Sequence, residues 1–263
     1  MKKFVLALTT IAAMTVSASA ADLAARPYAK AAPIVVAPNW TGFYIFGGAG
    51  GGIWDADTNT VTNPGLVAVS RDQRMGGHGW YGTVGAGYDW QFAGSWVAGV
   101  FADGQFGDIR GSLTEIVGGF EGREKLRTSW AAGVRVGYLV APNVYSYVNG
   151  GYSGSEWSGV NFSTLAAGGG PALFSTRSFN RNGWFVGGGV ENNLNIFGIA
   201  APGWFMKTEY RFAEYERVNL PESFVGGNVA TGLAVSAKPI VQTVSTSLVY
   251  RFNWGGAPVV AKY

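Results

Sequence analysis

The segment of residues 241–252, near the C-terminus, alternates between apolar and polar side chains with a period of two. One face is mostly apolar and ends in two aromatic rings: Val244, Thr246, Leu248, Tyr250 and Phe252. The other face is mostly polar: Thr243, Ser245, Ser247, Val249 and Arg251. Because side chains of a β-strand alternate between the faces of a sheet, one side of this segment suits hydrocarbon and the other a polar interior. This pattern is typical of a transmembrane β-strand.

The N-terminus predicts export from the cytoplasm. Lys2 and Lys3 precede a short apolar run over residues 4–16, and Ala18, Ser19 and Ala20 form a small-residue cleavage site. These are the parts of a secretory signal peptide, and the apolar run is too short to span a bilayer as a helix. We therefore expect residues 1–20 to be a signal peptide that is cleaved after Ala20.

Composition narrows the class of protein further. After residue 20, no stretch approaches the roughly 18 consecutive apolar residues that a membrane helix needs, although 48% of the chain is hydrophobic and only 13% is charged. A closed β-barrel also satisfies all its backbone hydrogen bonds in lipid. Removing Lys2 and Lys3 leaves 17 of the 19 basic residues against 16 acidic ones, which gives no basic excess for nucleic acid. With no cysteine, disulfide scaffolds and cysteine-ligated metals are excluded.

The chain from Trp40 onward predicts eight strands, separated alternately by short turns and long polar connections. The expected strands are residues 40–54, 78–92, 95–106, 127–140, 143–156, 182–195, 203–214 and 240–253. The expected long loops are residues 55–77, 107–126, 157–181 and 215–239. Short turns on one side and long loops on the other are typical of outer-membrane barrels. We predict an all-β, eight-stranded, antiparallel, up-and-down transmembrane barrel with short periplasmic turns and long extracellular loops.

The domain boundaries follow from these strands. We expect residues 40–254 to form the barrel. Residues 21–39 contain three prolines, and we expect them to be a flexible periplasmic segment. The alternative is that residues 34–36 form a short strand or a plug. Residues 255–263 read as a periplasmic tail, because Gly255, Gly256 and Pro258 break a strand.

The polar faces of the expected strands place acids and bases in the lumen in equal number. The predicted network contains Asp89, Asp103, Arg135, Glu191, Lys207, Glu209, Arg211 and Arg251. Unpaired charge is costly in a narrow interior, whereas paired charge is tolerated. An eight-stranded barrel is just wide enough for side chains to fill it. We expect a lumen closed by ion pairs; the alternative is that these charges sit near strand ends and are solvated.

The apolar faces predict aromatic girdles at the two membrane boundaries. The predicted girdle residues are Trp80, Tyr88, Trp90, Trp130, Tyr138, Trp204, Tyr210, Phe212, Tyr250 and Phe252. At about 3.3 Å per residue and a tilt near 40°, Trp80 and Trp90 are separated by roughly 25 Å along the membrane normal. That separation matches the height of the apolar band of a barrel.

Candidate catalytic and cofactor residues are few. His78 is the chain's single histidine and follows Gly76 and Gly77. A histidine at a barrel rim can serve an acyl-transfer site or ligate haem iron, but a solvated histidine explains it as well. We predict no enzyme activity, no catalytic residue, no cofactor and no metal.

Three stretches resemble a known family. Residues 248–263, residues 21–26 at the expected mature start, and residues 40–44 are similar to the small "porin family" outer-membrane proteins of alphaproteobacteria, within the OmpA-like and OmpX-like barrel group. The resemblance implies an abundant eight-stranded barrel of the outer membrane with a role in envelope integrity. It also implies contact with the lipid bilayer and lipopolysaccharide, and with the barrel-assembly machinery during biogenesis. Relatives include haemin-binding surface proteins.

The leading functional hypothesis is therefore a porin-like structural protein of the cell outer membrane with a narrow or plugged polar lumen. We expect it to be a monomer and to have no nucleic-acid partner. The first alternative is a surface receptor or adhesin that binds haem or a host ligand through its long loops. The second is a small-solute pore. A rim enzyme acting on lipid would need His78.

Overall fold

The computed structural model describes residues 39–115, 119–164, 170–199, 201–227 and 229–252. The strands are β1 (Gly42–Thr62), β2 (Gln73–Phe92), β3 (Trp96–Glu115), β4 (Phe120–Ala141), β5 (Val144–Trp157), β6 (Asn161–Thr164), β7 (Phe174–Ser175), β8 (Phe179–Asn193), β9 (Trp204–Tyr215), β10 (Val218–Phe224) and β11 (Ala230–Arg251). A short 3-10 helix, η1 (Leu194–Phe197), connects β8 and β9. The predicted signal peptide, nearly all of the predicted segment 21–39 and the predicted tail 255–263 lie outside the described residues.

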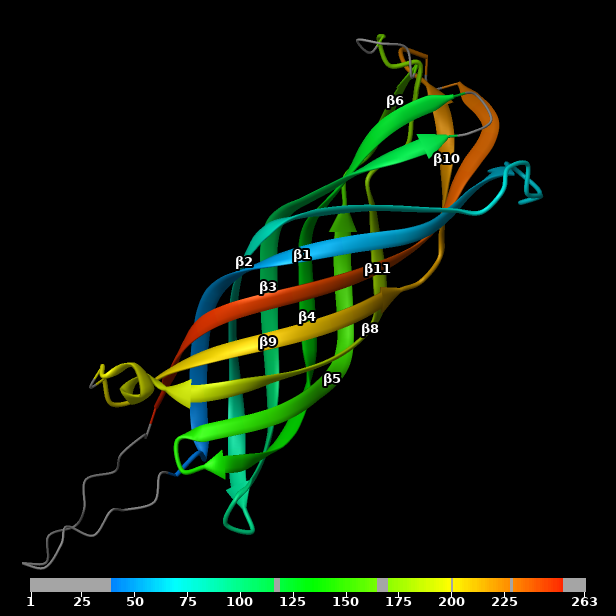
Figure 1. Ribbon diagram of the computed structural model, residues 1–263. Coiled ribbons are helices and arrows are strands. Elements are labelled where there is room, and N and C mark those ends of the chain that lie inside the picture. The colour runs from blue at the N-terminus through cyan, green and yellow to red at the C-terminus, as the bar shows by residue number, and fades with distance from the viewer. Residues whose placement is uncertain (1–38, 116–118, 165–169, 200, 228, 253–263) are drawn as a thin grey trace, which may run out of the picture. The chain divides into compact units, whose positions relative to one another are not determined.

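Eight strands close into a ring in the order β1-β2-β3-β4-β5-β8-β9-β11, all antiparallel to their neighbours (Figure 1). The ring closes where β1 pairs with β11, from Tyr44 opposite Arg251 to Thr62 opposite Leu233. This arrangement confirms the predicted eight-stranded antiparallel barrel. No helix among the described residues is long and apolar enough to cross a membrane.

The two ends of the barrel differ. At the end that we call the terminal end, the amide of Phe252 donates to the carbonyl of Phe43 at 3.0 Å, so the first and last described residues lie together. Short turns join β2 to β3 and β4 to β5 at this end, and the strand limits lie within two residues of those predicted.

At the opposite, distal end the prediction of four long loops is wrong in large part. β1 continues to Thr62, β3 to Glu115, and β11 begins at Ala230, well inside the segments expected to be loops. The sequence misleads here because the outward side chains change from apolar to charged, as at Asp55 and Asp57. The pairing and the alternation nevertheless continue.

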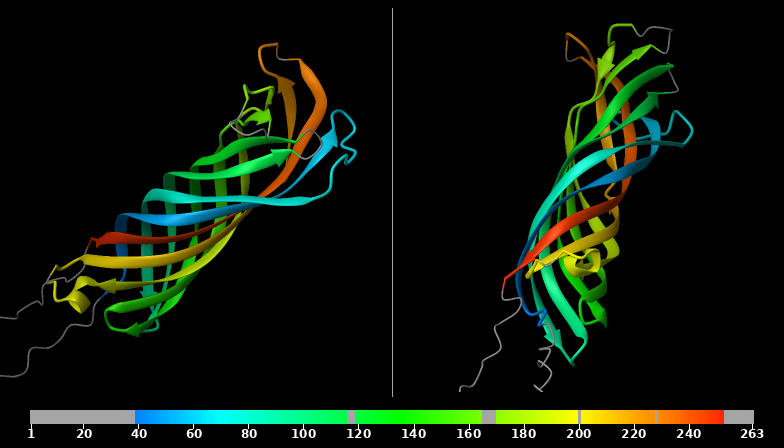
Figure 2. Two further views of the ribbon diagram at one scale, coloured as in Figure 1. Left: turned by 45° about the horizontal axis from the view of Figure 1, so that its top comes forward. Right: turned by 60° about the vertical axis from the view of Figure 1, so that its left-hand side comes forward.

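The distal ring has a different membership from the ring in the middle of the barrel. There β5, β8 and β9 are replaced by the short strands: β6 pairs with β4, β7 with β6, β10 with β7, and β11 with β10. The views in Figure 2 show these short strands stacked above the main ring. The strands of the barrel wall therefore remain hydrogen-bonded to one another beyond the level at which the outer surface is apolar.

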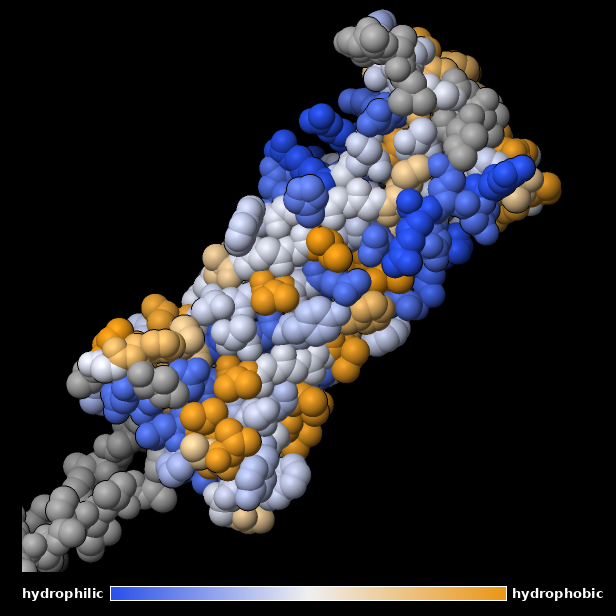
Figure 3. Space-filling view, in the orientation of Figure 1, coloured by the Kyte–Doolittle hydropathy of each residue, from blue (hydrophilic) through white to orange (hydrophobic). Residues whose placement is uncertain are grey.

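The outer surface of the middle of the barrel is apolar. Exposed side chains there include Ile45, Val84, Val100, Val134, Val148, Val186, Val244 and Leu248. Figure 3 shows one face, where white and orange residues cover the middle of the wall and strongly hydrophilic residues gather toward the distal end. Monomeric soluble proteins rarely expose contiguous apolar surface on this scale. The belt indicates contact with lipid.

Candidate functional site

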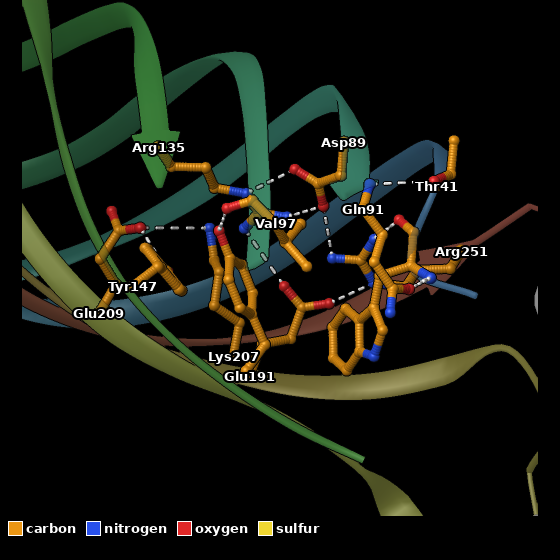
Figure 4. A network of polar contacts seen from close by, with 12 residues as sticks. Thr41, Asp89, Gln91, Val97, Arg135, Tyr147, Glu191, Lys207, Glu209 and Arg251 are labelled. Atoms are coloured by element: carbon orange, nitrogen blue, oxygen red, sulfur yellow. Dashed lines mark hydrogen bonds and ion pairs between the residues drawn. The ribbon is translucent and has the colours of Figure 1, made fainter. Parts of the chain in front are cut away.

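The interior of the barrel holds a layer of four charged side chains near the terminal end (Figure 4). Asp89 is on β2, Arg135 on β4, Glu191 on β8 and Arg251 on β11, which are alternate strands of the ring. Each of the four residues is at most 3% exposed. Because alternate strands point their side chains to the same height of a barrel, the four charges meet in one layer across the lumen.

The layer is a closed circuit of ion pairs. Arg135 donates to both carboxylate oxygens of Asp89, at 3.0 and 2.6 Å, and to Glu191 at 3.2 Å. Arg251 donates from Nε to Glu191 at 2.7 Å and from Nη2 to Asp89 at 2.8 Å. Each carboxylate thus contacts both guanidinium groups. Such mutual pairing offsets the desolvation cost of buried charges.

Aromatic rings hold the two guanidinium groups from the sides. Arg135 lies 4.2 Å from the ring centroid of Tyr44, and Arg251 lies 4.4 Å from that of Trp40. The Trp40 side chain is 1% exposed and packs against Phe205 with ring centroids 5.0 Å apart. Trp40 precedes β1 and lies inside the barrel, whereas the sequence suggested that it begins the first strand. Its indole closes the terminal side of the charged layer.

A second charged layer lies next to the first. Arg211 on β9 donates to Asp103 on β3 at 2.9 and 2.6 Å, which joins opposite sides of the ring. Arg211 also donates to Glu209 at 2.8 Å. Glu209 accepts further hydrogen bonds from Tyr147 at 2.8 Å and from Asn149 at 2.9 Å.

Lys207 completes this layer. Its Nζ lies 3.8 Å from Glu209 and 3.4 Å from the ring centroid of Phe46. All eight residues expected to form the lumen network are therefore buried, and the structure brings them together in two adjacent layers.

The sequence did not identify the neutral members of these layers. Tyr44, Tyr147 and Asn149 are buried in the lumen and contact the charged groups. Their inward position follows from the alternation of side chains along a strand. The apolar and polar residues of β1 and β5 alternate only weakly in sequence, so the inward face of these strands could not be assigned. Glycine at an inward position also marks the place of a neighbouring ring, because a Cβ at Gly85 would overlap the ring of Phe46. Small residues on one strand thus make room for rings from the next.

The distal part of the interior is mostly apolar. Its buried apolar side chains include Trp54, Ile109, Leu113, Leu126, Trp157, Val160, Phe162, Phe174, Val218, Leu220 and Val235, and buried polar side chains such as Thr58, Thr60 and Ser155 lie among them. Trp54 and Trp157 meet edge to face with ring centroids 5.5 Å apart. Two small internal cavities near this part, one beside Thr58 and one beside Tyr81, measure about 10 Å³ each, which is no more than one water needs.

Glu124 on β4 and Glu222 on β10 are carboxyl groups that are buried in this part. Glu124 on β4 is 3% exposed, and its Oε1 has no hydrogen-bond partner. The outward neighbours on this stretch of β4 are Arg123, Lys125 and Arg127, so Glu124 lies beyond the apolar belt. Burial raises the pKa of its side chain from 4.5 to about 8. Nothing in the sequence marks this residue, because acids were expected there only in a loop.

The ten predicted girdle residues all lie on the outer surface, exposed or half-buried. Tyr88, Trp90, Tyr138, Trp204, Tyr250 and Phe252 lie toward the terminal end, and Trp80, Trp130, Tyr210 and Phe212 toward the distal end. Ring contacts cross neighbouring strands, as between Trp204 and Tyr250 at 5.1 Å. Phe43, Trp96, Tyr152 and Trp184 belong to the same two bands and were missed.

His78 lies within β2 and its side chain is exposed on the outer surface. Its directly paired neighbours are Ile53 on β1 and Arg110 on β3. The residue is therefore part of the barrel wall and not of a rim loop.

An apolar outer belt between aromatic bands, with a polar interior filled by side chains, defines a membrane-spanning β-barrel of the small, side-chain-filled class. The chain belongs to the outer-membrane β-barrel family: residues 6–252 match the family described as "Outer membrane protein beta-barrel domain". The protein is accordingly an outer-membrane protein.

Individual relatives agree with this family. The chain is 30% identical over 252 residues to the 31 kDa outer-membrane immunogenic protein of Brucella melitensis biotype 1, covering 93% of this chain and 98% of that protein. The protein of the same name from Brucella suis biovar 1 matches equally. Among solved structures, the outer membrane protein OprG from Pseudomonas aeruginosa aligns with a TM-score of 0.51 and 10% identity, over 82% of this chain and 100% of that chain. This last likeness shows the fold alone.

Proposed function

We propose that this protein is a structural barrel of the outer membrane whose lumen is closed, and that it supports the envelope without conducting solutes. The observation that carries the proposal is the layer of Asp89, Arg135, Glu191 and Arg251, in which ion pairs cross the lumen between alternate strands. A solute would have to break several buried ion pairs to pass, which costs several kcal/mol for each charge left unpaired.

Two further levels of the interior support closure. Trp40 fills the terminal side of the charged layers, and the apolar core around Trp54 and Trp157 fills the distal side. The closed lumen thus consists of an aromatic level, two charged levels and an apolar level. The proposed role includes no catalytic step.

The topology supports an orientation and a set of partners. In bacterial barrels with an even number of strands, the short turns face the periplasm and the longer connections face the outside. We therefore assign the terminal end to the periplasm and the distal end to the cell exterior. The proposed partners are the bilayer, lipopolysaccharide in its outer leaflet and the barrel-assembly machinery, and the proposed state is a monomer.

Conductance in planar bilayers tests the closed lumen. The mature protein is reconstituted at neutral pH beside a known porin as positive control. We expect no stable open state of porin size, because the buried ion pairs span the lumen. A persistent porin-sized conductance would exclude the closed barrel and favour the small-solute pore.

A deletion strain tests the role in the envelope. We expect increased sensitivity to detergents and to large antibiotics, restored by the wild-type gene. Unchanged detergent sensitivity together with slower uptake of a small hydrophilic solute would instead support a pore.

One observation favours the receptor or adhesin as a second candidate. Near the distal tips, apolar side chains are more than 40% exposed at Leu66, Val67, Phe224, Val225 and Val229. Exposed apolar groups at a surface often mark contact sites, and the Brucella relatives are named as immunogenic. Replacing Leu66 and Val67 by serine should weaken binding of haem or of host cells while leaving the barrel folded. Unchanged binding of haem and of host cells would exclude a receptor or adhesin site at Leu66 and Val67.

A further inference from the structure

We propose that β6 and β7 form a lid over the distal interior, and that this lid opens while the wall of the main ring stays closed. The two strands lie above the main ring at the distal end (Figure 2). The inference goes beyond the closed lumen proposed above, because an open lid uncovers only the distal interior. Both charged layers lie below the lid and keep their ion pairs.

Three neighbouring strands of the wall change side-chain direction at one level, where they pass into the short distal strands. The buried side chains of β5 are odd-numbered as far as Trp157, but the next buried ones are Val160 and Phe162. The same change separates β8 from β7 and β9 from β10. At each change two consecutive residues are left unburied: Ser158 and Gly159, Arg177 and Ser178, Glu216 and Arg217.

These irregular residues form the hinge of the lid. Side chains of a regular strand alternate between the two faces of a sheet, so each change marks an interruption of the strand, and such interruptions are where a sheet bends. On the opposite side of the ring, β1 keeps its alternation from Tyr44 to Thr60. The distal end is therefore hinged on one side and continuous on the other.

Short ladders join the lid to the strands beside it. Among the described residues, β6 is paired with β4 at Thr164–Phe120 and Ser163–Glu121, and β7 with β10 at Ser175–Ser223 and Phe174–Phe224. The amide of Val225 also donates to the carbonyl of Leu173 at 2.9 Å. By contrast, β5 and β8 are paired along the whole of β5, from Val144 to Trp157.

The two strands of the lid are tied to each other at the hinge. The amide of Thr176 donates to the carbonyl of Val160 at 2.8 Å, and the amide of Val160 donates to the hydroxyl of Thr176 at 3.3 Å. A Cβ at Gly159 would lie 2.6 Å from the carbonyl oxygen of Thr176, so glycine allows this close approach. We therefore expect β6 and β7 to move as one unit.

The inner face of the lid is apolar. Val160 and Phe162 are 1% exposed, and Phe174 is 6% exposed and meets Phe120 of β4 edge to face with ring centroids 4.7 Å apart. Gly122 of β4 makes room for the lid, because a Cβ there would overlap Val160. The outward residues of the lid are polar: Asn161, Ser163 and Ser175. Burial of the apolar face makes the closed lid the resting state.

Opening the lid breaks far fewer contacts than opening the ring. It breaks the two short ladders and exposes three large apolar side chains, whereas the ring opens only when ladders along whole strands break. Local opening of a protein takes place where such contacts are few. The lid should therefore open much more often than the barrel unfolds, and each opening exposes the distal interior to solvent.

Thiol labelling tests the opening, because the chain contains no cysteine. Val160→Cys places a thiol on the inner face of the lid. Val97→Cys is the matched control, since Val97 is 0% exposed within β3 of the main ring. The folded proteins react with a water-soluble maleimide, and mass spectrometry follows the reaction. We expect Val160→Cys to react while the barrel stays folded, and Val97→Cys to react only as fast as the barrel unfolds.

A disulfide lock tests whether the exposure comes from movement of the lid. Glu121→Cys/Ser163→Cys joins directly paired residues of β4 and β6, whose spacing suits a disulfide. Hydrogen exchange, followed by mass spectrometry, should be faster in β6 and β7 of the wild type than in β5. Oxidation of the lock should remove this difference and reduction should restore it. Thr208→Cys/Thr246→Cys, a paired position on β9 and β11, is the control and should leave exchange of the lid unchanged.

Three results would overturn the proposal. They are equal labelling of Val160→Cys and Val97→Cys, equal exchange of the oxidised and reduced lock, and equal exchange of β5, β6 and β7 in the wild type. The last measurement needs no variant, and heat-modifiable gel mobility confirms that each variant folds. None of these results changes the expected conductance, so the closed lumen is tested separately.

Discussion

At the scale of single residues, the lumen charges depend on one another. Asp89 contacts both Arg135 and Arg251, and so does Glu191. Removing one member leaves buried charge with fewer partners, which is costly even where the whole network contributes little net stability. Single substitutions should therefore have larger effects than the net contribution of the network suggests.

Arg135→Met tests this dependence. The change removes the bidentate partner of Asp89 and one partner of Glu191, so we expect a loss of about 3–5 kcal/mol in the free energy of unfolding. Urea unfolding of the barrel in lipid vesicles measures it. The control is Arg127→Met on the same strand, where the side chain is exposed and the change should be near zero. Equal, small losses for both variants would contradict the buried network.

Glu124 should make the free energy of unfolding depend on pH in the direction opposite to that of an ion-paired acid. Burial raises the pKa of its side chain to about 8 in the folded state, against 4.5 when solvated. Between these values the folded state holds a proton that the unfolded state has released, so the free energy of unfolding falls as pH rises, by about 1.4 kcal/mol per pH unit from this group.

The measurement is the difference in unfolding free energy between Glu124→Gln and the wild type across pH 4 to 9. The variant lacks the titrating proton, so its advantage over the wild type should grow from about pH 4.5 and level off above about pH 8. Glu121→Gln on the same strand is the control. A pH-independent difference would mean that Glu124 is solvated in the folded protein.

At the scale of elements, β4 shows how one strand meets three environments. From Trp130 to Tyr138 its outward residues are apolar, and from Arg123 to Arg127 its outward side is basic. Its inward side carries Arg135 in the charged layer and Leu126 in the apolar distal core. The amphipathic pattern of β4 therefore reverses along the strand. Within the apolar belt its apolar side chains point outward to lipid, and beyond the belt they point inward to the core.

Val134→Arg and Val140→Arg test the lipid-facing assignment of β4. Both valines point outward and are 60% and 63% exposed, but Val134 lies between the aromatic bands and Val140 beyond Tyr138 at the terminal end. Arginine should cost about 2–4 kcal/mol at the first position and about 0–1 kcal/mol at the second, because the cost depends on depth in the bilayer. Unfolding in vesicles measures both; equal costs would mean that this face does not contact lipid.

At the scale of the whole molecule, stability depends on closure. β1 and β11 are far apart in sequence, and their pairing from Tyr44–Arg251 to Thr62–Leu233 removes the last open edges of the ring. Because backbone groups cannot remain unpaired in lipid, the ring is expected to open only on global unfolding.

Gel mobility with and without boiling tests this closure. The unboiled protein in detergent should migrate as a compact β-rich species and the boiled protein as an extended one, with far-UV circular dichroism as the structural readout. Deleting residues 241–252, which removes half of the closing strand β11, should abolish the difference. Identical migration of boiled and unboiled wild type would contradict a closed barrel.

The sequence by itself determined the barrel, its strand number, its terminal-end boundaries and the inward face of the eight charged residues, because alternation with a period of two assigns each side chain to a face. It did not determine the distal strands, whose outward residues are as polar as those of loops, nor the partners within the lumen. Arg211 and Asp103 are joined at 2.9 and 2.6 Å although 108 positions separate them in sequence. Only ring closure and strand register decide such contacts, because they depend on which strands stand opposite each other and not on any local pattern.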